Sequence, residues 1–200
     1  MTVSERGTGS GGLLTGVVWA LLLLGACLSA REAAGPALPP AGDPWTASSP
    51  RRVDIPDLGV RAPVTARGLD PDGAIEPPPY ALADSVGWYA AGTAPGAAGV
   101  ALLVGHVDTE TRPAVFYRLS TLHPGRTVRV VRADGGVAEF TVDDVRVQPR
   151  DHFDAHRAFG PHRPGRAELR LITCGGTFDR ARRAYTANVV VSAYLTGGTR

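Results

Sequence analysis

Short hydrophobic runs separated by turn residues fill the chain after Arg51, and this pattern limits the fold more than any other feature. The turns include Pro124-Gly125 and Asp134-Gly135-Gly136, which are typical of tight reversals. The run Thr127–Arg132 alternates polar and apolar residues, as a half-buried strand does. Eight strands are predicted in this way: Val53–Ile55, Val60–Thr65, Val86–Tyr89, Val100–His106, Thr127–Arg132, Val137–Val147, Glu168–Cys174 and Asn188–Tyr194.

Many short strands within one domain favour an all-β fold that closes into a barrel, because closure leaves no strand edge unpaired. Residues 51–200 are enough to bury a complete core. Helices are expected to be few and short, at Ala81–Ser85 and Ala114–Leu119.

The chain before this domain divides into three parts. Residues 1–12 form a Gly-rich, flexible tail, and Leu13–Ala30 is a stretch without a charged residue. As a helix this stretch would span about 27 Å, close to a hydrocarbon core of about 30 Å. It is expected to be a transmembrane anchor, with a signal peptide and lipidation at Cys27, in a lipobox-like Leu-Gly-Ala-Cys, as alternatives. Residues 31–50, rich in Pro, Ala and Gly, are expected to be a linker.

Composition argues against several classes of function. The formal net charge of +2 is small for a nucleic-acid-binding protein, and the arginines are scattered among acidic residues. No spacing of Cys, His and carboxylates predicts a metal site, and no glycine-rich phosphate loop follows a strand. No metal and no cofactor are therefore expected.

Cys174 is the cysteine of the predicted domain, and it ends an apolar run. Exported proteins meet an oxidising environment in which thiols are usually paired, so an unpaired cysteine suggests a catalytic nucleophile. The alternative is a small buried hydrophobic residue. His106 ends the other continuously apolar run, Val100–His106. A thiolate attacks a carbonyl carbon and an imidazole protonates the leaving amine, which makes these two residues a candidate pair.

Several segments of the sequence, including those of Cys174 and His106, resemble a known family. The segments Val86-Gly87-Trp88-Tyr89, Val104-Gly105-His106-Val107-Asp108, Ala114–Leu119 and Leu171-Ile172-Thr173-Cys174 resemble the sortases, most closely the actinobacterial class F. The resemblance covers roughly residues 51–195. It implies an eight-stranded barrel and a membrane-bound cysteine transpeptidase with a Cys-His-Arg site outside the cell. Such enzymes cleave an LPXTG-like sorting signal between Thr and Gly, hold the product as a thioester, and pass it to a cell-envelope amine.

The sequence departs from the family pattern where many sortases carry the catalytic arginine. Asn188 stands at that position of the last run, and Arg170 replaces the Thr that opens the common cysteine motif. The arginines between the two runs are Arg180, Arg182 and Arg183. Arg180 is the preferred candidate because it follows Phe178-Asp179, as in similar class F sequences.

Two further residues are candidates for substrate binding. Asp108 lies two residues after His106, where it would either orient the imidazole or cap a turn. Thr173 precedes the cysteine and would place a hydrogen-bond donor near the substrate. Two other functions remain open: a cysteine peptidase that lets water resolve the thioester, and a surface β-barrel that binds ligands without catalysis. The expected partners are sorting signals and an amine acceptor, without nucleic acid.

Overall fold

The computed structural model describes residues 37–152 and 154–200, and its strands coincide with all eight predicted runs. Apolar content and alternation located the strands well, while their ends differ by up to five residues. The strands are β1 (Pro50–Ile55), β2 (Val60–Arg67), β3 (Val86–Tyr89), β4 (Gly99–Val104), β5 (Thr127–Arg132), β6 (Val137–Pro149), β7 (Ala167–Asp179) and β8 (Ala184–Thr199).

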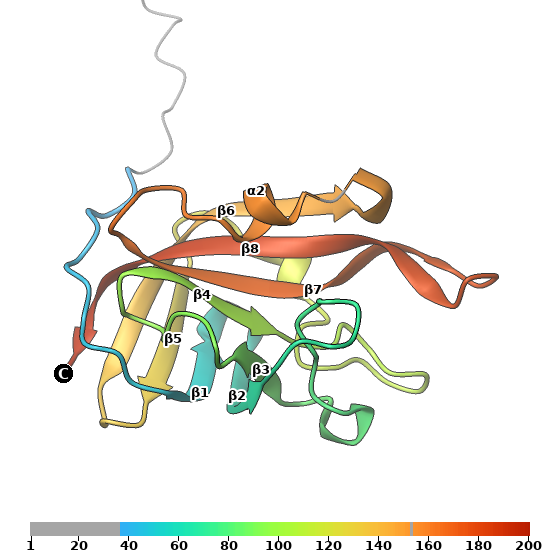
Figure 1. Cartoon of the computed structure of the whole chain (residues 1–200), viewed down its shortest axis with the longest axis horizontal. Coiled ribbons are helices and arrows are strands. Elements are labelled where there is room, and N and C mark those ends of the chain that lie inside the picture. The colour runs from blue at the N-terminus through green and yellow to red at the C-terminus, as the bar shows by residue number, and fades with distance from the viewer. Residues whose placement is uncertain (1–36, 153) are drawn as a thin grey trace, which may run out of the picture. The chain divides into compact units, whose positions relative to one another are not determined.

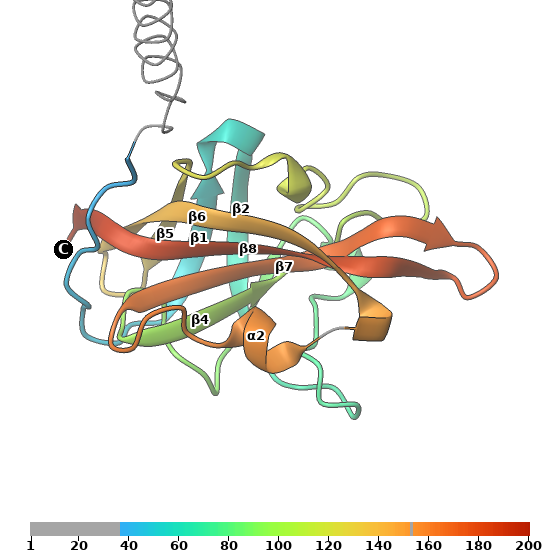
Figure 2. The same ribbon diagram turned by 90° about the horizontal axis from the view of Figure 1, so that it is seen from above.

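The strands close into a barrel in the order β1-β2-β3-β4-β7-β8-β6-β5, with β5 paired to β1 (Figures 1 and 2). The pairs β2·β3 and β4·β7 are parallel, and the other pairs are antiparallel. The predicted all-β closed barrel is confirmed. Because β4 and β7 are parallel neighbours, their carboxyl ends lie at the same end of the barrel.

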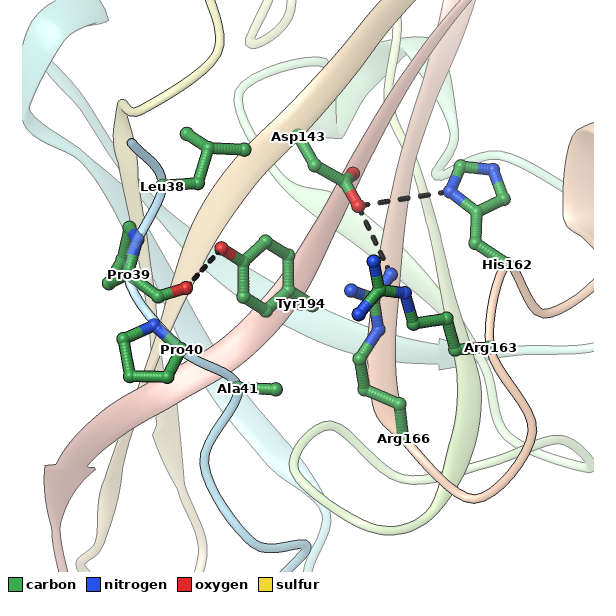
Figure 3. Close-up of a pocket in the computed structure, with 9 residues that line it drawn as sticks. All are labelled: Leu38, Pro39, Pro40, Ala41, Asp143, His162, Arg163, Arg166 and Tyr194. Carbon is green, nitrogen blue, oxygen red and sulfur yellow. Dashed lines mark hydrogen bonds and ion pairs between the residues drawn. The ribbon is translucent and has the colours of Figure 1, made fainter. Parts of the chain in front are cut away.

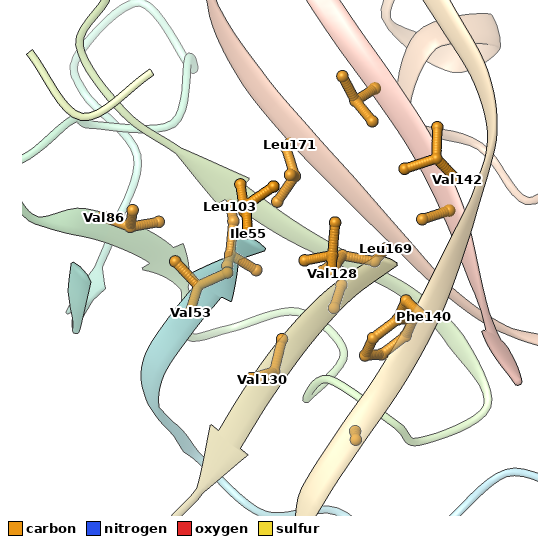
Figure 4. Close-up of a cluster of buried hydrophobic side chains, with 14 of the residues drawn as sticks. Val53, Ile55, Val86, Leu103, Val128, Val130, Phe140, Val142, Leu169 and Leu171 are labelled. Carbon is orange, nitrogen blue, oxygen red and sulfur yellow. The ribbon is translucent and has the colours of Figure 1, made fainter. Parts of the chain in front are cut away.

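Hydrophobic side chains from several strands fill the barrel (Figure 4). In β5, Val128 and Val130 are fully buried, while Arg129 between them is exposed. In β7, Leu169 and Leu171 likewise belong to the core cluster, together with Phe140 from β6. Burial of a large aliphatic or aromatic side chain contributes about 1.5–3 kcal/mol, so this cluster is the main source of the barrel's stability.

The helices are short. The described part of the chain contains the α-helix α2 (Ala155–Phe159) and 3₁₀ turns at Pro56–Leu58, Tyr80–Leu82, Leu119–Thr121 and Arg150–His152. A short turn replaces the helix expected at Ala81–Ser85.

The helix predicted at Ala114–Leu119 is absent, and that prediction was wrong. The backbone N–H groups of Ala114, Val115 and Phe116 donate instead to the carbonyl oxygens of Val107, Ala83 and His106. These bonds fix the start of the segment to distant parts of the chain. The local bonds that follow, from Tyr117 to Ala114 and from Leu119 to Phe116, span three residues, as in turns, and are not the i→i−4 bonds of an α-helix.

The segment before β1 packs on the barrel. Gly42 donates to the Leu195 carbonyl and Trp45 to the Gly96 carbonyl, and residues 38–200 form one compact unit. The linker expected over residues 31–50 thus includes a stretch, from residue 38 on, that belongs to the barrel. No helix within residues 37–152 and 154–200 is long and apolar enough to cross a membrane. The predicted anchor Leu13–Ala30, with Cys27, lies outside the described residues.

Candidate active site

Cys174 lies on the outer face of β7. Leu169, Leu171 and Thr173 point into the barrel, so the pleat of the strand turns Cys174 to the other side. There it is a free, partly exposed thiol. In the β7·β8 register its partner is Asn188, whose side chain shares this face.

His106 is next to Cys174 on the neighbouring strand. The parallel register pairs Val104 with Ile172, and Gly105 N–H donates to the Ile172 carbonyl at 3.0 Å. Continuing this register places His106 beside Cys174. The two candidate residues therefore lie at the same end of two adjacent, parallel strands.

The imidazole of His106 is held from the side of the β2–β3 connection. Its Nε2 lies 2.6 Å from the Pro78 carbonyl oxygen. Its ring stacks on Tyr80 with centroids 4.3 Å apart. Because a carbonyl oxygen only accepts, this hydrogen bond requires a proton on Nε2.

Arg150 brings the positive charge to the site. It follows directly after β6, and its Nη2 lies 3.3 Å from Cys174 Sγ. The register explains this contact, since Gln148 of β6 pairs with Asn188, which pairs with Cys174. Sequence analysis missed Arg150, because only the closed order β6-β8-β7 brings it close.

The three arginines expected near Cys174 lie elsewhere. Arg183 pairs with Glu110 at 2.9 Å and Arg182 with Asp179 at 3.7 Å, both at the surface. Arg180 is exposed, and its side chain has no hydrogen bond or ion pair among the described residues. It follows Cys174 by six residues, about 20 Å along an extended strand.

The β7–β8 hairpin explains why Arg180 is distant. It runs past the rest of the barrel in both views (Figures 1 and 2). Phe178 makes an edge contact with Tyr185 across the hairpin, and Asp179 accepts from the N–H groups of Ala181 and Arg182. Both residues thus hold the turn in an outward course, whereas the sequence suggested that they direct Arg180 toward the cysteine.

Asp108 accepts a short hydrogen bond from the hydroxyl of Tyr185 on β8. This bond, with partial burial, raises the pKa of Tyr185 to about 12, because the carboxylate stabilises the protonated phenol. The negative charge of a Cys174 thiolate contributes in the same direction, so Tyr185 lies near the candidate nucleophile. No sequence motif pointed to Tyr185.

Thr173 is buried inside the barrel, on the face opposite to Cys174. Its hydroxyl oxygen has no hydrogen-bond partner in the described residues. The structure therefore offers the hydroxyl no route to a substrate at Cys174, and only the Thr173 backbone is near the nucleophile.

The site thus combines a thiol, a hydrogen-bonded imidazole and a guanidinium at one end of the barrel. Together they can attack a carbonyl carbon, protonate a leaving amine and hold a negative oxygen. In the part of the chain that the structure describes, no group of three or more His, Cys, Asp or Glu side chains could hold a metal ion.

A family model described as "Sortase domain" matches residues 53–196, which is most of the chain. The search of curated proteins found no sequence that matches this chain.

Several solved structures share the fold. Sortase C-1 from Streptococcus pneumoniae is 21% identical with a TM-score of 0.54, and the match covers 72% of this chain. It covers 65% of the length of that sortase, slightly less than two thirds. Sortase C-1 from Actinomyces oris is 20% identical with a TM-score of 0.55, over 88% and 98% of the two chains. A lid mutant of sortase A from Corynebacterium diphtheriae is 16% identical with a TM-score of 0.55, over 85% and 75%. At these identities the likeness establishes the barrel fold.

Proposed function

From its membership of the sortase family, whose members are cysteine transpeptidases, we propose that this chain is a transpeptidase acting through Cys174, most like the actinobacterial class F enzymes. Its substrate is an LPXTG-like sorting signal, cleaved between Thr and Gly, and its acceptor is a cell-envelope amine. The observation that carries the proposal is the contact of Arg150 with Cys174, together with the parallel register that places His106 at the same end of the barrel.

In the first half of the reaction, Cys174 starts as the thiolate and His106 as the imidazolium, and Cys174 Sγ attacks the carbonyl carbon of the substrate threonine. A C–S bond forms, and the tetrahedral intermediate then breaks its C–N bond to the glycine. The leaving amine needs a proton, and the hydrogen bond to Pro78 supports His106 as its source, because it keeps a proton on Nε2. Release of that bond lets Nε2 reach the amine.

In the second half, the acceptor amine attacks the thioester carbon. His106, now neutral, takes the amine proton, a C–N bond forms and the C–S bond breaks. Cys174 is thereby returned to its starting state, and the peptide is joined to the acceptor.

Arg150 is the arginine that we assign to the oxyanion. A guanidinium presents several donors in one plane and stays charged. From 3.3 Å it can stabilise the thiolate, and the carbonyl oxygen that this sulfur attacks will develop its charge nearby. Catalysis by Arg180 stays a prediction from the sequence, and the exposed position of that residue argues against it.

The proposed location is the cell membrane, with the catalytic domain outside the cell and Leu13–Ala30 as the anchor. Intact-mass measurement of the membrane-extracted protein tests this. A chain that keeps residues 1–12 indicates a span, whereas a chain that begins at an acylated Cys27 indicates lipidation. A soluble protein that begins near Arg31 would exclude both.

The function is tested with a fluorogenic Leu-Pro-X-Thr-Gly peptide, with and without a glycine-type amine. We expect cleavage by the wild-type chain, a ligated product when the amine is present, and a thioester adduct by mass spectrometry. Cys174→Ala removes little volume at a partly exposed position and should abolish all three while leaving the barrel folded. Cleavage without ligation would identify a hydrolytic peptidase. No cleavage, together with a thiol that resists alkylation, would favour a binding module.

A further inference from the structure

A polar pocket lies at the opposite end of β7 from the cysteine (Figure 3). Its volume is about 460 Å³. One wall is the segment Leu38–Ala41, and the other is the connection before β7 that carries His162, Arg163 and Arg166. Seven residue steps separate Ala167 from Cys174, about 23 Å along a strand, so a ligand here would not touch the candidate active site.

The connection that carries the arginines is held rigidly by Glu168. This fully buried carboxylate accepts from the backbone N–H groups of His162 and Arg163, both at 2.9 Å. It also accepts from Arg166 at 2.9 Å and from Arg170 at 2.7 Å. The pocket wall is therefore preorganised, which lowers the entropy cost of binding a ligand.

The charges around the pocket leave one arginine uncompensated. Arg166 bridges Glu168 and Asp143, and Arg170 pairs with Glu168, so two acidic and two basic side chains balance. Arg163 has no ion pair within residues 37–152 and 154–200, although its side chain points into the pocket (Figure 3). His162 is partly exposed beside it, with Nδ1 3.8 Å from Asp143.

The remaining pocket contacts also restrict what can bind. The Tyr194 hydroxyl donates to the Pro39 carbonyl, and the Arg166 guanidinium lies over the Tyr194 ring, 4.5 Å from its centroid. Neither group is therefore free to bind a ligand. The Arg163 guanidinium has no hydrogen bond or ion pair among the described residues, and the His162 imidazole has only the 3.8 Å approach to Asp143. Both lie beside the apolar surface of Leu38 and Pro40, while Asp143 Oδ1 is a buried oxygen without a hydrogen bond on the same pocket wall.

We infer that this pocket binds a phosphate ester through Arg163 and His162. A guanidinium fork matches two oxygens of a tetrahedral anion, and a third oxygen remains for the imidazole. The apolar wall suits the carbon portion of the ester. Phosphate can come from a soluble ester or from a phospholipid headgroup, and only residues 31–37 separate the pocket wall from the end of the predicted anchor.

The test uses the full chain in neutral detergent micelles, with arginine side-chain NMR signals as the readout. The probes are inorganic phosphate, glycerol 3-phosphate, and phosphatidylglycerol added to the micelles, with phosphatidylcholine at the same mole fraction for comparison. We expect saturable shifts of the Arg163 Nε signal. A response to both soluble probes and to the lipid identifies a general phosphate site, whereas a response to phosphatidylglycerol alone identifies a headgroup site.

Arg163→Ala should weaken binding of the responding probe about tenfold or more, since a hydrogen-bonded charge is lost. Arg163→Lys, which keeps the charge but not the planar fork, should lie between this variant and the wild type. Arg51→Ala is the matched control, because it removes one exposed arginine from β1. The inference is overturned if no phosphate probe binds, or if Arg163→Ala and Arg51→Ala bind equally well.

Discussion

In the proposed site, Arg150 supplies from a different strand the charge that many sortases carry at the position of Asn188. The resemblance to sortases places a catalytic arginine where this chain has Asn188, directly across from Cys174. Arg150 reaches the sulfur from the end of β6, the strand on the far side of β8. Because Gln148, Asn188 and Cys174 are in register, a long side chain two residues beyond Gln148 can reach the thiol.

Replacing Arg150 tests this assignment. Arg150→Ala should lower kcat/KM for the peptide by about 10²–10³, the usual cost of losing one oxyanion donor. Arg180→Ala removes the same charge from the exposed hairpin and should leave the rate within about twofold of wild type, since exposed substitutions usually have small effects. Steady-state kinetics on one peptide compares the two variants. The opposite ranking would return the role to Arg180 and make the Arg150 contact incidental.

Tyr185 provides a test in alkaline solution. Its pKa is raised to about 12 from an ordinary value of 10.0, chiefly by its hydrogen bond to Asp108. The protonated phenol therefore stabilises the folded chain below pH 10, and this contribution is lost as the pH rises through about 12. Tyr185→Phe lacks the contribution at every pH.

We therefore expect the unfolding free energies of wild type and Tyr185→Phe to converge between pH 10 and pH 12, as measured by urea denaturation. Tyr117→Phe is the control, since Tyr117 is an exposed tyrosine. A difference between wild type and Tyr185→Phe that stays constant over this range would show that the Asp108 bond does not form in solution.

At the scale of elements, the sequence predicted the positions of the strands, because these depend on local hydrophobic pattern. β3 and β5 were predicted to the residue, because each is a short run bounded by turn residues. The segment Ala114–Leu119, predicted as a helix, forms turns, and its first three N–H groups bond to distant carbonyls, which no local pattern records. The placement of His106 at the same end of the barrel as Cys174 could be predicted from two strand ends. The contact of Arg150 with Cys174 depends on the strand order of the closed barrel.

The connection between β6 and β7 depends on Glu168. Burial alone would raise its pKa, but the N–H groups of His162 and Arg163 and the guanidinium of Arg170 hold the pKa below its ordinary value. The carboxylate thus stabilises the fold above pH 4.5, and this contribution is lost as the pH falls through the folded-state value.

Glu168→Gln should lower the free energy of unfolding at pH 7 by about 3 kcal/mol or more, because Arg170 would keep a buried charge without its anion. Glu139→Gln, which breaks an exposed pair with Arg129, should cost less than about 1 kcal/mol. Urea denaturation of both variants measures these values. Equal losses would mean that the buried network contributes no more than a surface pair.

For the whole molecule, the segment before β1 closes one part of the barrel. Arg132 is buried to 1% side-chain exposure, and it donates to the Thr46 carbonyl at 2.5 Å and to the Pro95 carbonyl at 3.3 Å. Trp45 lies against its guanidinium, 5.2 Å from the ring centroid. The barrel residues alone supply Pro95 and the partly exposed Asp134 as partners for this charge.

Two truncations should therefore behave differently. Removal of residues 1–36 leaves every described contact of Arg132 in place, so the shortened chain should unfold at the same urea concentration as the full chain in detergent. Removal of residues 1–49 deletes Trp45 and the Thr46 carbonyl and exposes one side of the guanidinium.

We expect the longer truncation to lose about 3 kcal/mol, the order of magnitude for removing a partner from a buried charge. Arg132→Met in the shorter truncation is the matched comparison, since it removes the charge that requires those partners. If Arg132 is the reason for the loss, the Met variant should be less sensitive to the further removal of residues 37–49. Equal sensitivity would assign the loss to apolar packing of Trp45, and no loss in either background would mean that the barrel is complete from β1 onward.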